Sequence, residues 1–303
     1  SRLKKIEELS IFKIMIKNFI KRYKNQLNFF IENALNEDIG IGDHTSLSCI
    51  DARMKSSAKL VVKQSGYIAG VALSKLIFEH YDPRLKVETI IKDGHKIRKG
   101  DIAFKVHGST LSILSTERLV LNTIQRMSSI ASLTKGLNKM ISHTNCKILD
   151  TRKTTPNFRY AEKLAVMIGG GTNHRMGLFD AILIKDNHID YCGGVKNTLT
   201  KTENYLKKIN KELDVIVECR NQKEIDSALN FNFVNRILLD NYNPSELSKA
   251  ISSINGRKST EASGRIGKNN IIEYAETGVD FISIGELTNN LKSIDMSLKA
   301  MVN

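Results

Sequence analysis

The stretch VIVECRNQKEIDSALNFNFVNRILLD, residues 215–240, decides the expected fold of this chain. It begins with the apolar run Val215-Ile-Val217, continues through an amphipathic segment from Gln222 to Asn230, and returns to the apolar run Arg236-Ile-Leu-Leu239. Short β-branched runs predict buried strands, whereas apolar residues at every third or fourth position predict a helix. A strand, a helix and a second strand in this order predict a right-handed crossover between parallel strands.

The same alternation extends to both sides of that stretch. The expected strands are Lys147–Leu149, Ala181–Ile184, Val215–Val217, Arg236–Leu239, Lys258–Thr260 and Phe281–Ile284. The helical segments that separate them include Arg159–Ile168, Gln222–Asn230, Pro244–Ile254 and Asn269–Glu276. This order predicts an α/β fold with an incomplete βα barrel of about six parallel strands, short of the usual eight. An open doubly wound sheet is the alternative.

The first half of the chain has a different pattern, which predicts a smaller α/β domain. Its expected strands, bounded by glycines, are Ala58–Val62, Tyr67–Ala69, Leu85–Ile91 and Asp101–Val106. Its expected helices are Met15–Leu35, Ala72–His80 and a long one from Leu114 to about Met140. The residues before Met15 have no clear assignment and are expected to form a mobile extension.

These patterns, together with the family resemblance given below, predict four segments along the chain. We expect an N-terminal extension of unclear role at 1–24, an N-terminal α/β sandwich domain at 25–128, a catalytic βα barrel domain at 129–287, and a C-terminal helix at 288–303 that packs back on the N-terminal domain.

Composition limits the class of protein. Apolar residues make up 41% and charged residues 26% of the 303 positions, which are ordinary values for a globular protein. No apolar run approaches the roughly 20 residues that cross a bilayer, so we expect no membrane partner. Cys49, Cys146, Cys192 and Cys219 have no paired spacing, which favours reduced cysteines and a cytoplasmic location.

The net charge of +14 raises the question of a nucleic-acid partner. The lysines are spread along the whole chain, and no aromatic residues alternate with them as a base-stacking surface requires. We therefore expect no nucleic-acid binding, and a basic RNA-binding protein remains the alternative from a different class. An anionic small-molecule substrate accounts better for the local groups of cations.

Residues with obvious chemistry directly follow the expected strands. In chain order they are Asp150–Lys153, Lys185 and Asp186, Glu218, Asp240 and Asn241, Ser263 and Gly264, and Gly285. The carboxyl ends of parallel strands meet at one rim of a barrel, where ligands bind. The sequence therefore predicts a ligand site at that rim.

Cations gather in three of these segments. They lie in Asp150-Thr-Arg-Lys-Thr-Thr-Pro156, Gly169-Gly-Gly-Thr-Asn-His-Arg175 and Lys185-Asp-Asn-His188. Arginine presents a planar fork that suits carboxylate or phosphate, and lysine a compact point charge. Together these cations predict a pocket for a small molecule with several negative charges.

The other residues of these segments allow two interpretations each. His174 either donates a hydrogen bond to the ligand or is a structural histidine. The glycines from Gly169 to Gly171 end a helix and also indicate a close backbone approach. Glu218 and Asp240 either balance charge or hold Mg²⁺ or ribose hydroxyls. The segment Glu261–Gly264 and Gly285 could present backbone N–H groups to a terminal phosphate.

These motifs resemble those of the quinolinate phosphoribosyltransferases, also called carboxylating nicotinate-nucleotide pyrophosphorylases, which are type II phosphoribosyltransferases. The resemblance extends through Glu37–Asp43, Thr116–Asn122, Leu239–Asn241, Glu261–Gly264 and Thr277–Gly285, and covers the chain from about Gln26 to Thr288. It implies an N-terminal α/β sandwich, a C-terminal barrel with fewer than eight strands, and a homodimer or higher oligomer with shared active sites.

The resemblance also implies a reaction. It is the Mg²⁺-dependent transfer of the phosphoribosyl group from phosphoribosyl pyrophosphate to quinolinate with loss of CO₂, which gives nicotinate mononucleotide and pyrophosphate for NAD biosynthesis. The alternatives are a related phosphoribosyltransferase that acts on nicotinate or another anionic ring, and a relative associated with molybdenum transport.

The family pattern implies a role for each matching residue. Quinolinate would be bound by Arg152, His174, Arg175, Lys185 and, from the partner subunit, Arg118. Phosphoribosyl pyrophosphate would be bound by Lys153, Glu218, Asp240, Ser263, Gly264 and Gly285. Lys153, Lys185, Glu218 and Asp240 would be the catalytic residues, and Glu218 and Asp240 would hold Mg²⁺ directly or through water.

Three positions depart from the family pattern. Arg265 stands where the family usually repeats glycine, Ile216 replaces a common acidic residue, and Asn289 stands where histidine is usual. The cations expected to bind the pyridine ring are all present.

Overall fold

A computed structural model describes residues 2–289 and 291–301, with side chains from residue 12 onward. The chain divides into two compact units. Unit 1 consists of Ser1–Lys135, Thr154–Gly170 and Thr288–Asn303, and unit 2 consists of Gly136–Lys153 and Gly171–Leu287. None of the helices in the described ranges is long and apolar enough to cross a membrane.

Unit 2 contains the repeated strands that the sequence predicts. They are β6 (Lys147–Leu149), β7 (Ala181–Ile184), β8 (Asp214–Glu218), β9 (Arg236–Asp240), β10 (Ser259–Ser263) and β11 (Phe281–Ser283). All of their pairings are parallel. The central residues are buried in every strand except β7, whose Ile182 and Leu183 are partly exposed, because helices cover one side of the sheet and facing side chains fill the other.

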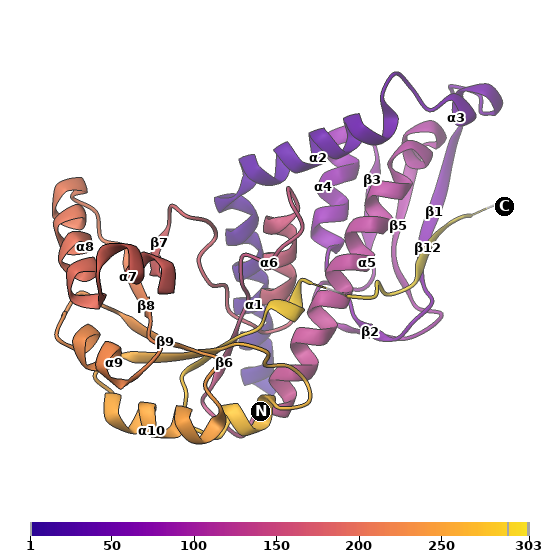
Figure 1. Cartoon of the computed structure of the whole chain (residues 1–303). Coiled ribbons are helices and arrows are strands. Elements are labelled where there is room, and N and C mark those ends of the chain that lie inside the picture. The colour runs from indigo at the N-terminus through magenta and orange to yellow at the C-terminus, as the bar shows by residue number, and fades with distance from the viewer. Residues whose placement is uncertain (1, 290, 302–303) are drawn as a thin grey trace. The chain divides into compact units, whose positions relative to one another are not determined.

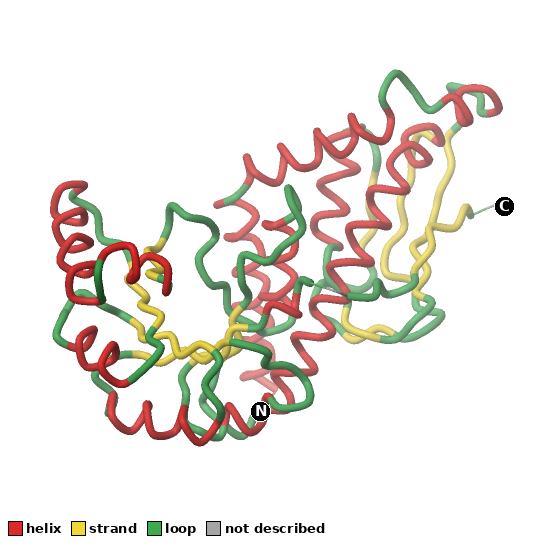
Figure 2. The backbone as a smooth tube through the Cα atoms, in the orientation of Figure 1, coloured by secondary structure: helices red, strands yellow, loops and turns green. Residues whose placement is uncertain are grey.

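The strand order identifies the sheet as an incomplete barrel. The order is β6-β11-β10-β9-β8-β7, so each strand from β7 to β11 lies beside its neighbour in sequence, and β6 follows β11. A doubly wound sheet would instead reverse direction at a switch point, which excludes the alternative. The band of strands curves in Figure 2. It is open between β6 and β7, where Thr172 bridges in parallel to Leu149.

Amphipathic helices connect these strands (Figure 1). They are α7 (Asp186–Cys192), α8 (Val195–Ile209), α9 (Gln222–Leu229), α10 (Pro244–Ile254) and α11 (Ile271–Ala275), followed by the 3₁₀ turn η1 (Gly285–Leu287). Helix α10 shows why they begin and end where they do. The Asn243 side chain accepts the Glu246 N–H, Pro244 occupies the first turn, and Asn255 adopts the left-handed conformation at the end.

Unit 1 contains an antiparallel sheet and most of the longer helices. The sheet has the order β12 (Met296–Ala300), β1 (Lys55–Val62), β5 (Ile102–Ser109) and β3 (Lys86–Thr89), and a short ribbon joins β2 (Gly66–Tyr67) to β4 (Lys96–Ile97). The helices are α1 (Arg2–Arg22), α2 (Lys24–Ile39), α3 (His44–Cys49), α4 (Val71–Tyr81), α5 (Thr110–Met140) and α6 (Arg159–Ile168). This arrangement confirms the expected α/β domain.

The expected C-terminal helix is wrong. Residues Met296–Ala300 form strand β12, which pairs antiparallel with β1. Met296 and Leu298 are buried, while Ser297 and Lys299, which alternate with them, are more exposed, and this period of two is that of a strand. Packing on the N-terminal domain is therefore achieved by backbone pairing. Residues 290, 302 and 303 lie outside the described residues.

The expected helix from Met15 to Leu35 is present but divides into two helices at Tyr23, and the residues before Met15, which the sequence leaves unassigned, belong to the first of them. Backbone helix begins at Arg2, and the two helices α1 and α2 meet at Tyr23, whose ψ of 26° is not helical. The Tyr23 ring packs on Phe19 and on Tyr160 of α6, which fixes the break. Residue 1 lies outside the described range, and side chains are described only from Phe12.

A third correction concerns helix α6, which the sequence places in the barrel domain at 129–287. Its segment, Thr154–Gly170, groups with unit 1, where α6 contacts α1 and α2. Glu162 of α6 is fully buried and accepts the Arg126 Nε–H of α5 at 2.8 Å. A buried carboxylate needs such a partner, and this contact joins α6 to α5 within unit 1.

Candidate active site at the carboxyl rim of the barrel

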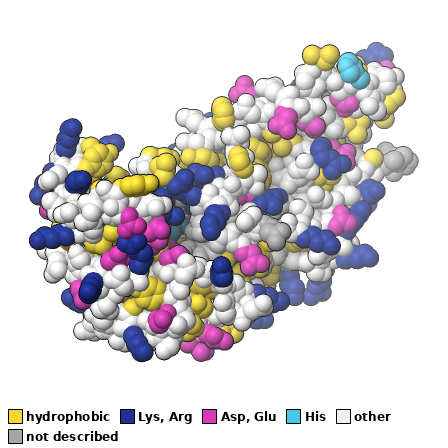
Figure 3. Space-filling model, in the orientation of Figure 1, with side chains coloured by type: hydrophobic (Ala, Val, Ile, Leu, Met, Phe, Trp, Pro, Cys, Tyr) yellow, Lys and Arg dark blue, Asp and Glu magenta, His cyan; other side chains and the backbone are white. Residues whose placement is uncertain are grey.

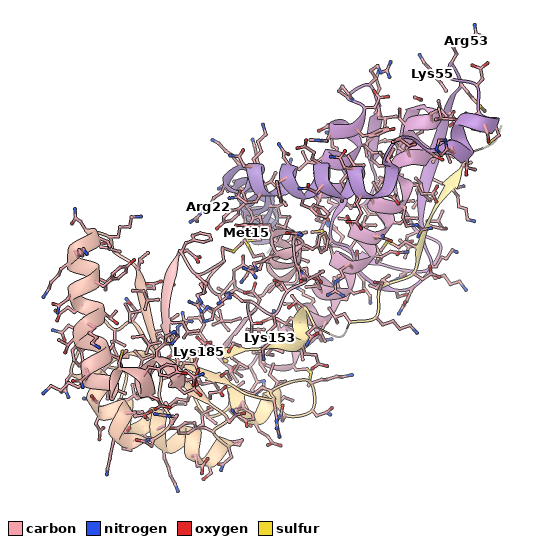
Figure 4. All side chains as sticks on the ribbon, turned by 45° about the horizontal axis from the view of Figure 1, so that its top comes forward. Met15, Arg22, Arg53, Lys55, Lys153 and Lys185 are labelled. Atoms are coloured by element: carbon pink, nitrogen blue, oxygen red, sulfur yellow. The ribbon has the colours of Figure 1, made fainter. Side chains whose placement is uncertain are left out.

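The parallel strands of unit 2 bring the chemically active side chains to one rim. Arg152 and Lys153 follow β6, Lys185 follows β7, Glu218 ends β8, Asp240 ends β9, Ser263 ends β10 with Gly264 next to it, and Gly285 follows β11 by two positions. The predicted convergence at the carboxyl ends is confirmed as a matter of topology. Figure 4 labels Lys153 and Lys185 among the side chains of this unit.

Two carboxylates stand on this rim next to a cation. Glu218 is half-buried, and its pKa is raised first by that burial and then by the negative charge of Asp240. The positive charge of Lys185 acts on Glu218 in the opposite direction. The three groups are therefore close enough to influence one another, although they follow three different strands.

Asp240 is held in place by its neighbours. Its Oδ1 accepts a short hydrogen bond from the Ser263 hydroxyl, and its Oδ2 accepts from Asn241 Nδ2 at 2.6 Å. The register of the sheet explains the first contact, because Asp240 and Ser263 lie opposite each other on β9 and β10. One oxygen of the Asp240 carboxylate is therefore hydrogen-bonded to the end of β10, the strand that is expected to bind phosphate.

A fit to Mg²⁺ rests on these two carboxylates. No group of three or more His, Cys, Asp or Glu placed to hold a metal occurs within residues 2–289 and 291–301. Mg²⁺ commonly takes one or two protein carboxylates and completes its shell with water and substrate phosphates. Glu218 and Asp240, which repel each other, fit that pattern, because a divalent cation would relieve the repulsion.

Lys185 is positioned by the start of helix α7. Its backbone N–H donates to His188 Nδ1 at 3.0 Å, and its carbonyl oxygen accepts the N–H groups of His188 and Ile189. These bonds fix the main chain of Lys185 and leave its side chain exposed. The lysine therefore presents its charge at the rim from a rigid turn.

Arg152 and Arg175 also lie close to each other. The pKa of Arg175 is lowered first by its partial burial and then by the positive charge of Arg152. The Arg175 Nη1–H also reaches the Ala181 carbonyl oxygen at 3.4 Å. Two like charges held together in this way favour a bound anion with more than one negative charge.

Asp150 ties the segment that carries His174 and Arg175 to strand β6. It is fully buried, and its carboxylate accepts the His174 N–H at 2.8 Å and the Asn173 side-chain amide at 2.6 Å. The Thr172 N–H donates to the Ile148 carbonyl oxygen at 2.8 Å. The chain after the glycines therefore runs along the free edge of β6, which explains how a motif twenty residues later reaches the same rim.

His174 has partners at both ring nitrogens. Its Nδ1 accepts the Arg175 N–H at 2.7 Å, and its Nε2 lies 3.4 Å from Glu261 Oε2. Its side chain is 8% exposed. Of the two interpretations of His174 in the sequence, this arrangement fits the structural one.

Lys153 and Gly285 lie against each other. A Cβ built on Gly285 would be 3.0 Å from Lys153 Cδ and 3.7 Å from its Nζ. The absence of a side chain at position 285 therefore leaves the space in which the lysine chain lies, and the sequence could not show this contact.

The comparisons with known proteins agree with this geometry. Residues 130–299 match the model of the quinolinate phosphoribosyl transferase C-terminal domain, and residues 43–128 match that of its N-terminal domain. The chain belongs to the quinolinate phosphoribosyltransferase family. It is accordingly an enzyme of the pentosyltransferase class.

Individual relatives support the same assignment. The chain is 44% identical over 288 residues to the chloroplastic nicotinate-nucleotide pyrophosphorylase (carboxylating) of Arabidopsis thaliana, which covers 90% of this chain and 82% of the relative. It is 43% identical over 281 residues to the mitochondrial quinolinate phosphoribosyltransferase (decarboxylating) 2b of Nicotiana tabacum, covering 88% and 80%. The solved nicotinate-nucleotide pyrophosphorylase of Francisella tularensis superposes with a TM-score of 0.83 at 36% identity, covering 91% of this chain and 96% of that one.

The departure from the family pattern at Arg265 has a backbone consequence. Arg265 adopts a φ of +53°, in the left-handed region that glycine occupies without strain. Gly264 beside it has a φ of +98°, and a Cβ there would lie 2.8 Å from the Asn241 backbone nitrogen. The loop after β10 therefore requires glycine at 264, whereas the position of Arg265 only favours glycine and leaves an exposed cation there.

The other departures are simpler. Ile216 is buried on β8, where it pairs in register with Leu183 and Arg236. Asn289 is exposed, next to the undescribed residue 290. Arg118, which the resemblance assigns to a partner's site, is an exposed residue of α5 in unit 1.

The glycine motif serves packing as well as chain reversal. A Cβ on Gly169 would lie 2.6 Å from both the Ala131 carbonyl oxygen and Thr134 Cβ, so the end of α6 touches the backbone of α5. Gly170 has a φ of +86°. The close approach that the sequence predicts is therefore at least in part an approach between two helices.

Reasoning from sequence missed the roles of three residues of unit 2. Asp150 anchors the segment that carries His174, and Arg236 forms an ion pair with Glu261, with 2.8 Å between Arg236 Nη1 and Glu261 Oε2. The ion pair had two signals in the sequence, an acidic residue within a short strand and a basic residue at the start of the preceding strand. On the surface, Lys and Arg are spread over the face drawn in Figure 3, as the spacing of lysines predicts.

Proposed function

We propose that this enzyme transfers the phosphoribosyl group from phosphoribosyl pyrophosphate to quinolinate with Mg²⁺ present, and releases pyrophosphate and CO₂ to give nicotinate mononucleotide. The observation that carries the proposal is the rim of unit 2, where Lys185 lies near two carboxylates at the ends of neighbouring strands. A pair of arginines that lie close to each other is carried by segments that reach the same rim. The name of the Nicotiana tabacum relative supports quinolinate as the substrate and the loss of a carboxylate.

The cations have a clear task in this reaction. Quinolinate carries two negative charges and phosphoribosyl pyrophosphate several more, and two unit charges about 4 Å apart repel by roughly 4 kcal/mol at an effective dielectric of 20. Arg152, Arg175 and Lys185 would offset that repulsion at the pyridine carboxylates. They would also hold the ring nitrogen toward the anomeric carbon, an orientation effect that can supply several kcal/mol.

The carboxylates would act on the sugar. Glu218 and Asp240 would favour the positive charge that grows on the ribose ring as its bond to pyrophosphate breaks. Mg²⁺, when bound by these residues and the substrate, would stabilise the departing pyrophosphate. The Ser263 hydroxyl and the backbone at Gly264 and Gly285 would bind the 5-phosphate, and Lys153, which lies over Gly285, would add a cation there.

Loss of CO₂ requires no further side chain. Once the ring nitrogen carries the ribose, it is a positively charged pyridinium, and its charge stabilises the electron pair left on the adjacent carbon when the carboxylate there departs as CO₂. A proton from water then takes the place of the carboxylate on that carbon. The protein would supply position and charge for this step.

We also infer a homodimer in which Arg118 of one subunit completes the site of the other, and a cytoplasmic location. The dimer accounts for an exposed arginine on α5 that the family pattern assigns to quinolinate. The location rests on four cysteines that are all free, whereas the two plant relatives are named chloroplastic and mitochondrial.

A product assay tests the proposal. Purified protein with quinolinate, phosphoribosyl pyrophosphate and Mg²⁺ should form nicotinate mononucleotide and release one CO₂ per product. Chelation of divalent cations should stop turnover, and added Mg²⁺ should restore it. Product from nicotinate without CO₂ release would instead assign the alternative substrate, and no product from either ring would contradict the proposal.

A further inference from the structure

Three polar side chains form a connected, largely buried chain inside unit 2. Arg236 begins strand β9, and its Nη1–H donates to Glu261 Oε2 of β10 at 2.8 Å. The same Oε2 lies 3.4 Å from His174 Nε2. Glu261 is fully buried, and the Arg236 guanidinium packs over the Phe281 ring at 4.0 Å.

The charge state of Glu261 follows from its partners. Burial by itself would raise the pKa of this carboxyl, but the hydrogen bonds and charges of His174 and Arg236 outweigh burial and lower it. Glu261 is therefore a buried carboxylate. An apolar pair of similar size often replaces a buried ion pair without loss of stability, so folding alone gives little reason for this one.

The consequence for His174 is a fixed ring. Its Nδ1 accepts the Arg175 N–H, so Nε2 is the nitrogen that carries the proton and faces Glu261. The His174 N–H donates to the buried Asp150 carboxylate at 2.8 Å. These contacts fix the backbone next to Arg175, whose side chain lies near that of Arg152.

We propose that Glu261 is a positioning residue for the anion site, with Arg236 as its charge partner. Glu261 holds the imidazole of His174 through Nε2, the imidazole holds the backbone N–H of Arg175, and Arg236 supplies the positive charge that offsets the buried Glu261 carboxylate. Neither Glu261 nor Arg236 needs to touch a substrate. The inference rests on the proposed function, because that function identifies the anion bound at Arg175 as a carboxylate of quinolinate.

Two double variants separate positioning from stability. Arg236→Met/Glu261→Met removes both charges together, so no buried charge is left unpaired, but it deprives His174 Nε2 of its acceptor. Arg236→Met/Glu261→Gln also removes both charges and restores an acceptor in the amide oxygen.

The kinetic result expected is specific to one substrate. In the Met/Met variant the KM for quinolinate should rise roughly ten- to a hundredfold, the usual effect of losing a residue that orients a binding group. The KM for phosphoribosyl pyrophosphate and the melting temperature should stay close to those of the wild type. The Met/Gln variant should keep a KM for quinolinate close to that of the wild type.

A spectroscopic readout tests the same chain without turnover. In protein labelled with ¹⁵N-histidine, the His174 signal, identified by its loss in His174→Asn, should report a proton fixed on Nε2. This signal should change in the Met/Met variant and return in the Met/Gln variant.

The outcomes distinguish the two proposals. A wild-type protein that makes no nicotinate mononucleotide contradicts the proposed function, whereas the histidine signal still tests the positioning chain. A wild-type His174 with its proton on Nδ1 overturns the inference, even if the Met/Met variant does not fold. An unchanged quinolinate KM in a folded Met/Met variant, or an equal loss in the Met/Met and Met/Gln variants, overturns it as well.

Discussion

Glu218, a carboxylate of the proposed site, is expected to lower the stability of the folded chain at neutral pH. Burial and then the Asp240 charge raise its pKa. A carboxyl with a higher pKa in the folded than in the unfolded chain destabilises the fold at pH values above its folded pKa, and this penalty disappears as the pH falls below the unfolded pKa.

Glu218→Gln should therefore melt at a higher temperature than the wild type at pH 7, because glutamine removes the penalty. The difference should shrink as the pH is lowered toward about 4, where the glutamate is protonated in both states. Turnover should fall by about a hundredfold or more, since charge stabilisation at the sugar is lost. Melting curves at several pH values test this, and an equal or lower melting temperature at pH 7 would contradict it.

Arg265 carries a second prediction at this scale. Arg265→Gly relieves a left-handed backbone that costs a residue with a side chain roughly 1 kcal/mol, partly offset by the greater freedom of glycine when unfolded. The melting temperature should therefore stay the same or rise. The KM for phosphoribosyl pyrophosphate should rise about tenfold, because a cation beside Gly264 is lost.

Steady-state kinetics with each substrate varied in turn measure this effect. A KM for phosphoribosyl pyrophosphate that does not change in Arg265→Gly would show that Arg265 contributes nothing to phosphate binding.

Some residues of the candidate site could be predicted from the sequence, and others could not. The cations at 152, 175 and 185 could be predicted because each follows a recognisable strand or motif. The roles of Asp150, Arg236 and Glu261 could not, because each depends on a partner from another strand or loop. Spacing along the chain predicts which rim a residue reaches but not which neighbour it meets there.

Helix α6 and helix α5 make the clearest case at the scale of elements. Gly169→Ala places a methyl group 2.6 Å from the Ala131 carbonyl oxygen and from Thr134 Cβ, where backbone cannot yield cheaply. We expect a loss of stability of about 1–3 kcal/mol, the range for overpacking a tight contact. Urea unfolding measures it.

Gly136→Ala is the matched control. Gly136 lies within α5, is exposed, and a Cβ there meets no other atom within 4 Å. Alanine favours a helix over glycine by roughly 1 kcal/mol, so this variant should be more stable than the wild type. A Gly169→Ala protein as stable as the wild type would contradict the close packing of α6 on α5.

The elements themselves were predicted unevenly, for physical reasons. Strands and helices of unit 2 follow from periodicity, because each buries a continuous apolar face. Strand β12 was mistaken for a helix, because only its pairing with β1 selects the extended form over so short a segment. Helix α6 was assigned to the wrong unit, because the contact between Glu162 and Arg126 that joins it to α5 spans 36 positions in the sequence.

At the scale of the whole molecule, the proposed shared site predicts complementation. Arg118→Ala and Lys185→Ala should each be nearly inactive, since one removes a residue given to the partner and the other a residue of the subunit's own rim. Mixed dimers of the two variants would contain one intact site. Activity should therefore recover to as much as about a quarter of wild type on random exchange, by counting sites.

Native mass spectrometry should confirm that subunits have exchanged before activity is measured. Exchange without any recovery would contradict the shared site while leaving the reaction itself untouched.

The central claim is that cations at the rim of the barrel select a ring with two carboxylates, and calorimetric titration tests it most directly. Quinolinate should bind the wild type roughly ten- to a hundredfold more tightly than nicotinate, the effect of one additional charged hydrogen bond. Arg175→Ala and Lys185→Ala should abolish that preference, whereas Lys207→Ala, which removes an exposed lysine paired with Glu203 on α8, should keep it. Equal affinity of the wild type for both rings, or a preference that survives in Arg175→Ala and Lys185→Ala, would contradict the account.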